Sequence, residues 1–254
     1  MNVNVRFHLL GGAVVLAAGL VVSVVTSTIV ASRAYEARGR MAVRTINEIN
    51  VRGSARVRVR SDVGRWAIEV KGESTTLADA YASLAAGTQK VQAFLKDHKF
   101  SDDEVSPGAI DTVPSYRLDA KGNRTSDIER YTLERTILVC SADVDRLAAV
   151  CGEVTELLKD GVQVLSRPPA YYYTKAQDLK VRILGEATAD ARSRAEEIAT
   201  KSGCRVSQVR AAHMGVIQIT KPDSTDVSSE GIYDTTSIAK DVSVVVSATF
   251  TVDG

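Results

Sequence analysis

The longest uncharged stretch of the chain places the strongest limit on its architecture. Leu9 to Ala31 are 23 residues without Asp, Glu, Lys or Arg. About 20 apolar residues span a bilayer as a helix, whereas a signal-peptide core has about 7–15 residues. The sequence therefore predicts a short tail (residues 1–8) and a transmembrane anchor or uncleaved signal (residues 9–31). A cleaved signal remains an alternative, because Ser32-Arg33-Ala34 could serve as a weak cleavage site.

The charges that flank this stretch leave its orientation open. One arginine precedes it and several follow it within residues 32–46, which form a charged juxtamembrane linker. The positive-inside rule alone would place the C-terminal side in the cytoplasm. The extracytoplasmic location that a family resemblance implies, described below, conflicts with this orientation.

The body of the protein is residues 47–254, and the chain beyond residue 34 has almost no net charge. Beyond residue 34 the chain carries 30 basic and 31 acidic residues. Binding of nucleic acid requires a basic field, so this balance argues against a nucleic-acid partner. The three cysteines, Cys140, Cys151 and Cys204, match neither a CxxC motif nor a zinc site. Free thiols and a Cys140–Cys151 disulfide both remain open.

Apolar periodicity predicts the order ββαββ–αβαββ for the body. We expect an α+β fold with two related halves and largely antiparallel sheets. Thr75 or Thr76 could cap the first helix, and Gly161 would end the second. The predicted strands are 49–60, 65–72, 109–118, 128–140, 162–165, 204–220 and 241–252, and the predicted helices are 77–99, 143–159 and one before Gly203.

The first strand has one basic face. Val57 and Val59 point one way, and Arg56, Arg58 and Arg60 point the other. The simplest interpretation is a half-buried strand with a solvated basic face. A charged subunit contact and attraction to anionic lipid headgroups are the sharper alternatives.

The helix before Gly203 has a face of small residues. Leu184, Ala187, Ala191, Ala195 and Ile198 follow steps of three and four, which place them on one side of a helix. The low profile of alanine allows close approach of another backbone. We expect this face to pack on a sheet or a second helix within the chain. The functional interpretation is an oligomer contact through the same face, and the two interpretations are compatible.

The segment Pro168–Tyr173 is a candidate binding surface. It contains two prolines followed by Tyr171, Tyr172 and Tyr173. Rigid aromatic side chains of this kind are common in protein interfaces. Packing of the tyrosines at a strand end, with their hydroxyl groups in solvent, is the simpler interpretation.

The sequence contains no convincing catalytic motif. It lacks a Gly-x-Ser-x-Gly elbow, a phosphate loop and a dinucleotide fingerprint. Cys204 and His213 could form a thiol and base pair, but they are nine residues apart on one predicted strand and would face opposite sides. We therefore predict a protein that is not an enzyme, with no catalytic, cofactor or metal residue.

Four motifs together resemble the SIMPL-domain family of bacterial envelope proteins, and most closely its membrane-anchored branch. They cover residues 46–252, although Ser61-Asp62 departs from the Pro-Asp that many relatives have. The motifs are Ile49-Asn50-Val51-Arg52-Gly53, the alanines at 187, 191, 195 and 199 with Gly203, the segment Met214–Thr220, and the segment Tyr233–Lys240 leading into the last strand.

The resemblance implies a periplasmic or surface-exposed α+β domain, homo-oligomeric rings in some members, and links to stress tolerance and protein–protein contacts. It supplies no catalytic residue. The leading hypothesis is a non-catalytic protein, anchored in the inner membrane through residues 9–31, that self-assembles in the envelope without a cofactor. A binding module that uses Pro168–Tyr173 is the second hypothesis. A hydrolase or redox enzyme is the third.

Overall fold

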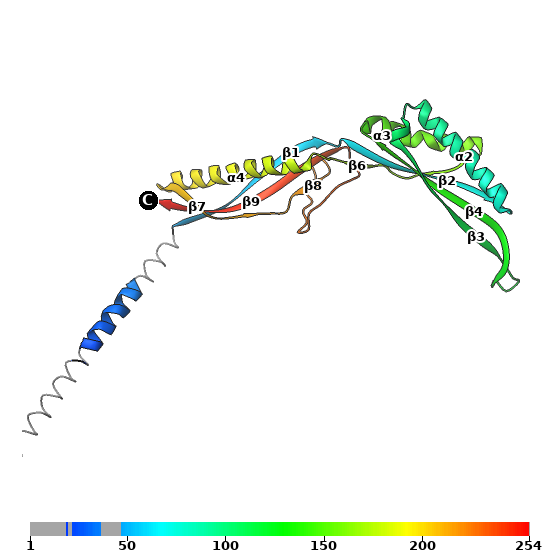
Figure 1. Ribbon diagram of the computed structural model, residues 1–254. Coiled ribbons are helices and arrows are strands. Elements are labelled where there is room, and N and C mark those ends of the chain that lie inside the picture. The colour runs from blue at the N-terminus through cyan, green and yellow to red at the C-terminus, as the bar shows by residue number, and fades with distance from the viewer. Residues whose placement is uncertain (1–18, 20–21, 37–46, 254) are drawn as a thin grey trace, which may run out of the picture. The chain divides into compact units, whose positions relative to one another are not determined.

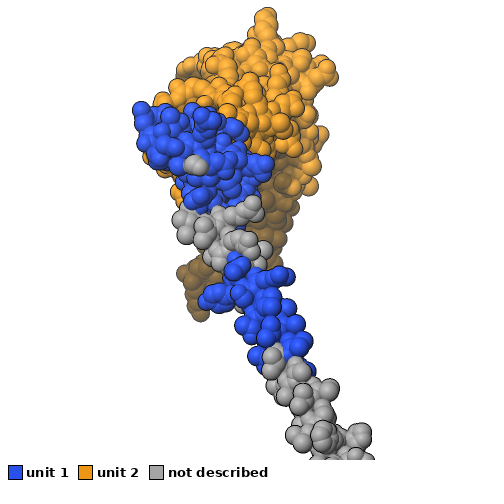
Figure 2. All heavy atoms as spheres, turned by 90° about the vertical axis from the view of Figure 1, so that its left-hand side faces the viewer, with its two compact units in different colours: residues 1–51, 192–212, 247–254 blue, residues 52–191, 213–246 orange. Residues whose placement is uncertain are grey.

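The computed structural model describes residues 19, 22–36 and 47–253. The chain divides into two compact units, which are coloured separately in Figure 2. The smaller unit comprises residues 1–51, 192–212 and 247–254, and the larger comprises residues 52–191 and 213–246. Both units draw on distant parts of the sequence.

Strands and helices follow the predicted α+β order closely (Figure 1). Two short 3-10 helices, Asp102–Glu104 and Val154–Asp160, accompany them. The strands are β1 Glu48–Arg60, β2 Val63–Ser74, β3 Val105–Leu118, β4 Arg124–Ser141, β5 Gln163–Ser166, β6 Ala170–Tyr172, β7 Arg205–Met214, β8 Gln218–Thr220 and β9 Ala239–Asp253; the α-helices are α2 Leu77–Asp97, α3 Val144–Glu153 and α4 Ala176–Lys201.

The strands form two sheets, with the order β1-β9-β7 in one and β3-β4-β2-β5 in the other. Strand β8 pairs with β9, and β6 pairs with β2. The pairings of β2 with β4, β5 and β6, of β3 with β4 and of β8 with β9 are antiparallel, as predicted. The predicted division into consecutive halves is wrong, because β1 pairs with β9 and not with β2.

In the smaller unit, the start of β1 is tied to the end of β9 by a hydrogen bond. The backbone N–H of Val252 donates to Asn47 O at 3.1 Å, and Gln208 N donates to Thr251 Oγ1 at 3.1 Å. Arg210 forms an ion pair with Glu48. These contacts connect the start of β1 to the end of β9, β9 to β7, and β7 to β1.

One core of the larger unit lies between α2, α3 and the sheet that contains β2. Trp66, Ile68 and Val70 alternate along β2 and are buried, together with Leu84 and Val91 of α2. Alternate residues of a strand share one face, so this face of β2 is fully covered by the helices. The predicted cap of α2 is confirmed at Thr76, whose side chain accepts from Asp79 N.

A second core lies between α4 and the sheet that contains β9. Val242, Val244 and Val246 pack with Leu179 and Ile183. The buried stripe of α4 advances in steps of four, and Ile198 is exposed on another face, contrary to the predicted stripe. Leu184 is only partly buried. The buried residues of the stripe are Leu179, Ile183, Ala187, Ala191, Ala195 and Ala199.

Two glycines allow a helix to approach a strand at very short range. A Cβ atom at Gly53 of β1 would lie 2.2 Å from both Ala187 O and Ala191 N of α4. A Cβ atom at Gly72 of β2 would lie 2.4 Å from Ala80 O and Leu84 N of α2. Both sheets therefore pack a helix backbone directly against a strand glycine, where any side chain would force the elements apart.

The predicted strand 204–220 is interrupted. It divides into β7 and β8, and the residues between them leave the ladder after Gly215 N donates to Val245 O at 2.8 Å. Gly161 and Gly203 both adopt the left-handed conformation, with φ of 77°, as expected for residues that end helices. The predicted helix 143–159 is an α-helix up to Glu153 and continues as a 3-10 helix from Val154.

Of the predicted anchor at residues 9–31, residues 9–18, 20 and 21 lie outside the described residues. Residues 22–36 are helical. No helix in the part of the chain that the structure describes is both long and apolar enough to cross a membrane.

Candidate functional site

The predicted basic face of β1 is largely occupied by ion pairs within the chain. Arg58 donates to Asp241 Oδ1 at 2.8 Å and to Asp223 Oδ1 at 2.6 Å. Arg60 pairs with Asp145. Asp241 is buried, and its hydrogen bond from Arg58 lowers the pKa of its carboxyl group. Arg58 therefore helps to hold residues 223 and 241 together, and Arg56 is exposed on the same face.

The three tyrosines of Pro168–Tyr173 have separate environments. Tyr171 is buried in the first core, and this burial raises the pKa of its hydroxyl group. Tyr173 packs against the second core. Tyr172 lies beside Tyr233, with 6.5 Å between the two ring centroids. The Arg65 guanidinium lies 5.2 Å from the centroid of the Tyr172 ring. The three side chains do not form one contact surface.

The alanine face of α4 is buried inside the chain. Ala187, Ala191 and Ala195 have no exposed surface, and Gly53 lies against the backbone of the first two. This geometry matches the interpretation of α4 as a helix packed on a sheet. These alanines leave no exposed area for a second chain to contact.

A buried lysine organises the turn before β9. Lys240 Nζ donates to Asp234 O at 2.6 Å and to Ser237 O at 2.7 Å, and it lies 3.4 Å from Asp234 Oδ2. Burial lowers the pKa of Lys240, and Asp234 partly opposes that effect. Burial alone would raise the pKa of Asp234, but hydrogen bonds from Ser237 and Thr236 outweigh it and the pKa is lowered. The Lys240–Asp234 pair therefore holds the turn at residues 234–237 in place.

Gln218 holds the loop between β8 and β9 in place. Its buried side chain donates to Ser228 O at 2.7 Å and accepts from Ile232 N at 2.8 Å. Ile219 N then donates to Ile232 O, and Asp234 N donates to Ile219 O, both at 2.8 Å. The loop is therefore held as an added edge beside β8.

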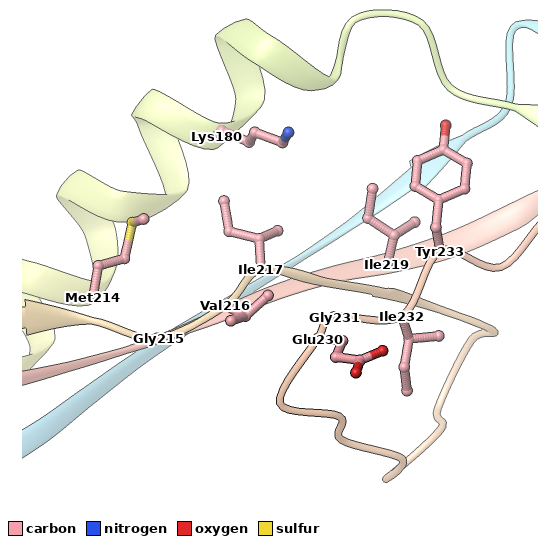
Figure 3. Close-up of a pocket in the computed structure, with 10 residues that line it drawn as sticks. All are labelled: Lys180, Met214, Gly215, Val216, Ile217, Ile219, Glu230, Gly231, Ile232 and Tyr233. Carbon is pink, nitrogen blue, oxygen red and sulfur yellow. The ribbon is translucent and has the colours of Figure 1, made fainter.

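The fixed loop borders an open groove of about 510 Å³ (Figure 3). Lys180 extends from α4, and Tyr233 rises from the loop at the other end of the groove. The lining is mainly apolar, and Met214, Val216 and Tyr233 are all exposed. Lys180 and Glu230 add one charge of each sign. The full lining is Lys180, Met214, Gly215, Val216, Ile217, Ile219, Glu230, Gly231, Ile232 and Tyr233.

A second unusual surface is the end of the β3–β4 hairpin. Pairing of β2 with β4 ends at Ser74 and Tyr131, whereas β3 and β4 remain paired from Ser115–Arg130 to Leu118–Arg124. We call residues 115–130 the arm; Figure 1 shows it extending past β2 and α2. Every residue of the arm is exposed except Tyr116 and Thr125, which are half-buried. Leu118 and Ile128 are 66% and 39% exposed.

Sequence reasoning missed both surfaces. The groove depends on Gln218, a single polar residue between apolar neighbours that gives no periodic signal. A usable signal was Lys240, because a charged residue next to the alternating valines of β9 requires a partner if it is buried. The arm could not be foreseen, because it exists only where β2 ends before its neighbours do.

The described residues offer no clear reactive centre. Within them, no group of three His, Cys, Asp or Glu residues could hold a metal ion. Cys140, Cys151 and Cys204 are free thiols, which answers the question left open by the sequence. Burial raises the pKa of the Cys151 thiol, so its thiolate form is disfavoured.

The SIMPL family model, described as "Protein of unknown function (DUF541)", matches residues 49–250. No curated protein matches the chain in sequence.

Among solved structures, the chain is similar to an amidase of the hydantoinase/carbamoylase family from Burkholderia phymatum, with 17% identity, a TM-score of 0.28 and coverage of 46% of this chain and 32% of the other. It is also similar to a putative aminohydrolase from methicillin-resistant Staphylococcus aureus, with 15% identity, a TM-score of 0.27 and coverage of 49% and 32%. The chain spans about a third of these proteins. TM-scores this low carry no argument about its fold or activity.

Proposed function

The chain belongs to the SIMPL family, a family of unknown function, and from that premise we propose that it is a non-catalytic, self-assembling protein of the cell envelope. In this proposal residues 9–31 anchor it in the inner membrane, and the body lies in the periplasm. Its partners are further copies of itself and other envelope proteins, and its role belongs to envelope or stress physiology.

The arm is the observation that carries self-assembly. A two-stranded hairpin with no third strand and no helix beside it is marginally stable alone in water. The arm nevertheless leaves Leu118 66% and Ile128 39% exposed, and neither side chain belongs to the two buried cores. Contact with a second copy would bury these side chains and stabilise the hairpin.

The ionisable groups support a non-catalytic role. Several described groups with shifted pKa values, including Asp234, Lys240 and Asp241, are engaged in contacts that hold loops and strands in place. Catalytic sites shift pKa values in clefts where a substrate can reach the group. Lys240 and Asp241 are buried by the chain itself, so their shifts follow from folding.

Chemical cross-linking in membranes tests the proposal. The full-length protein is expressed, membranes are treated with a short lysine-reactive reagent, and the products are separated under denaturing conditions. We expect a ladder of bands that stops at a fixed number of chains. A single band of one chain, at a reagent level that modifies the surface lysines, would reject self-assembly.

The groove favours a second function, binding of a peptide or small ligand. Tyr172, from the predicted binding segment, lies beside Tyr233 of the groove. Ligand sites are typically apolar hollows with a few polar groups, as this groove is.

Peptide selection against the purified body tests this second function. We expect apolar peptides that bind the wild-type protein and bind Val216→Asp at least about tenfold more weakly. Val227→Asp is the matched control, because Val227 is exposed in the same loop but does not line the groove. Equal binding to the wild-type protein and both variants would remove the groove from consideration.

A further inference from the structure

The body that carries the arm also has an apolar hollow. The hollow lies between the start of α2 and the β3–β4 hairpin and has a volume of about 610 Å³. Leu77 and Tyr81 border it and are 49% and 55% exposed. We call it the α2 hollow; its lining residues are Leu77, Ala78, Tyr81, Ile110, Thr112 and Leu133.

Charge distinguishes the two surfaces. The arm tip, residues 116–124, carries Arg117, Lys121 and Arg124 against one acid, Asp119. The walls of the α2 hollow, residues 77–89, 105–116 and 131–135, carry Asp79, Asp111 and Glu134 against one basic residue, Arg135. The two surfaces therefore have opposite charge as well as exposed apolar side chains, which is the combination that favours specific association.

The arm tip is held in a defined shape. The Arg124 guanidinium lies 3.8 Å from the centre of the Tyr116 ring, and Asp119 accepts from Lys121 N and Asn123 N, each at 2.8 Å. These contacts order the turn without using the side chain of Lys121 or that of Leu118. The tip is thus a preformed contact surface, which lowers the entropy cost of binding.

Contact through the free edge of the hairpin is disfavoured. Strand β3 is the outermost strand of its sheet, and it contains Pro107 and Pro114. Proline has no backbone N–H and blocks the addition of a further strand. A partner is therefore expected to meet the tip and faces of the arm and not to extend the sheet along β3.

We propose that the arm tip of one copy docks in the α2 hollow of a second copy, with Leu118 against Leu77 and Tyr81 and with Lys121 beside Asp79. This inference rests on the proposed self-assembly and names its interface. The two surfaces differ, so the contact is heterologous: each copy offers one arm and one hollow. Repetition of such a contact closes into a ring when the rotation between copies permits.

Two surface variants of the full-length protein in detergent test the interface. The arm variant is Leu118→Asp with Lys121→Glu, and the hollow variant is Tyr81→Lys. Each exchanges exposed residues, and melting curves check that each remains folded. We expect each variant alone to have the mass of one chain, with association weakened at least about tenfold.

Mixing the two variants gives the sharper result. The intact hollow of the arm variant can accept the intact arm of the hollow variant, so a heterologous contact predicts a complex of one copy of each. Val181→Asp, an exposed substitution on α4, is the matched control and should keep the wild-type mass.

The outcomes separate the two proposals. A wild-type oligomer whose mass is unchanged in the arm variant, or variants that fail to pair when mixed, would overturn the docking proposal and leave self-assembly standing. Wild-type protein that runs as one chain in the same experiment would overturn both.

Discussion

At the scale of single residues, the close contact between Gly53 and α4 makes the stability of the fold depend on the absence of a side chain at position 53. We expect Gly53→Ala to reduce the free energy of unfolding by about 3 kcal/mol, because its Cβ atom would overlap the backbone at Ala187 and Ala191. Gly185→Ala on α4 is the control, since nothing lies within 4 Å of its added Cβ atom and alanine favours a helix. Denaturant unfolding measures both, and equal stability of the two variants would contradict this role.

The Asp234–Lys240 pair predicts a specific dependence of stability on pH. The folded pKa of Asp234 lies below its ordinary value of 3.8, so its contribution is complete above that pH and is lost as pH falls through the folded pKa. The folded pKa of Lys240 lies below 10.5, so the ammonium destabilises the fold at neutral pH and this cost disappears as pH rises toward 10.5.

Asp234→Asn should therefore cost about 3–5 kcal/mol at pH 7, because it leaves the buried Lys240 ammonium without its counter-charge. The deficit should shrink at alkaline pH, and the variant should lose less stability than wild type between pH 4 and pH 2. Unfolding curves across pH measure both effects. Asp226→Asn, an exposed carboxylate in the same loop, should change little; a matching loss in that variant would contradict the account.

Single residues of β1 show which features could be predicted from the sequence and which could not. The alternation of Val57 and Val59 with arginines correctly predicted a half-buried strand, since period two follows directly from strand geometry. The same alternation could not show that Arg58 reaches Asp241, because that partner is 183 residues away. Long-range ion pairs depend on strand pairing, which periodicity does not encode.

At the scale of elements, Gln218 determines the order of the loop that forms the groove. Gln218→Leu keeps a similar volume but leaves Ile232 N–H and Ser228 C=O without this partner. We expect a loss of about 1–3 kcal/mol and faster amide exchange across residues 228–233. Hydrogen exchange with mass spectrometry measures the rates.

Gln163→Leu is the control for this prediction, because Gln163 is exposed on β5. Unchanged exchange in residues 228–233 of Gln218→Leu would show that the loop is ordered by other contacts.

Helices and strands were predicted more accurately than their arrangement. The apolar steps of three and four in α4 and the valines of β9 identified both elements, although the buried stripe of α4 advances in steps of four. The pairing of β1 with β9 was missed, since sequence order favours pairing of neighbours and this contact joins the two ends of the body. The break between β7 and β8 was missed because Val216 and Ile217 continue the apolar pattern.

At the scale of the whole molecule, the arm should be dispensable for folding and necessary for assembly. Ser115 and Arg130 are paired, so an Asn-Gly turn can join them and remove residues 116–129. We expect the free energy of unfolding to change by less than about 1 kcal/mol, because the removed hairpin buries little. The oligomer should dissociate to single chains, as sedimentation would show.

A large loss of stability on this shortening would mean that the arm supports its own body, and assembly would then need another explanation. A stable variant that keeps the wild-type mass would show that the arm is not the contact.

The mass of the full-length protein in detergent, by light scattering with the detergent contribution subtracted, tests self-assembly most directly. One chain has a mass of 27.2 kDa. The account predicts one discrete multiple of that mass, unchanged over a tenfold range of protein concentration. A mass of one chain throughout that range would contradict it.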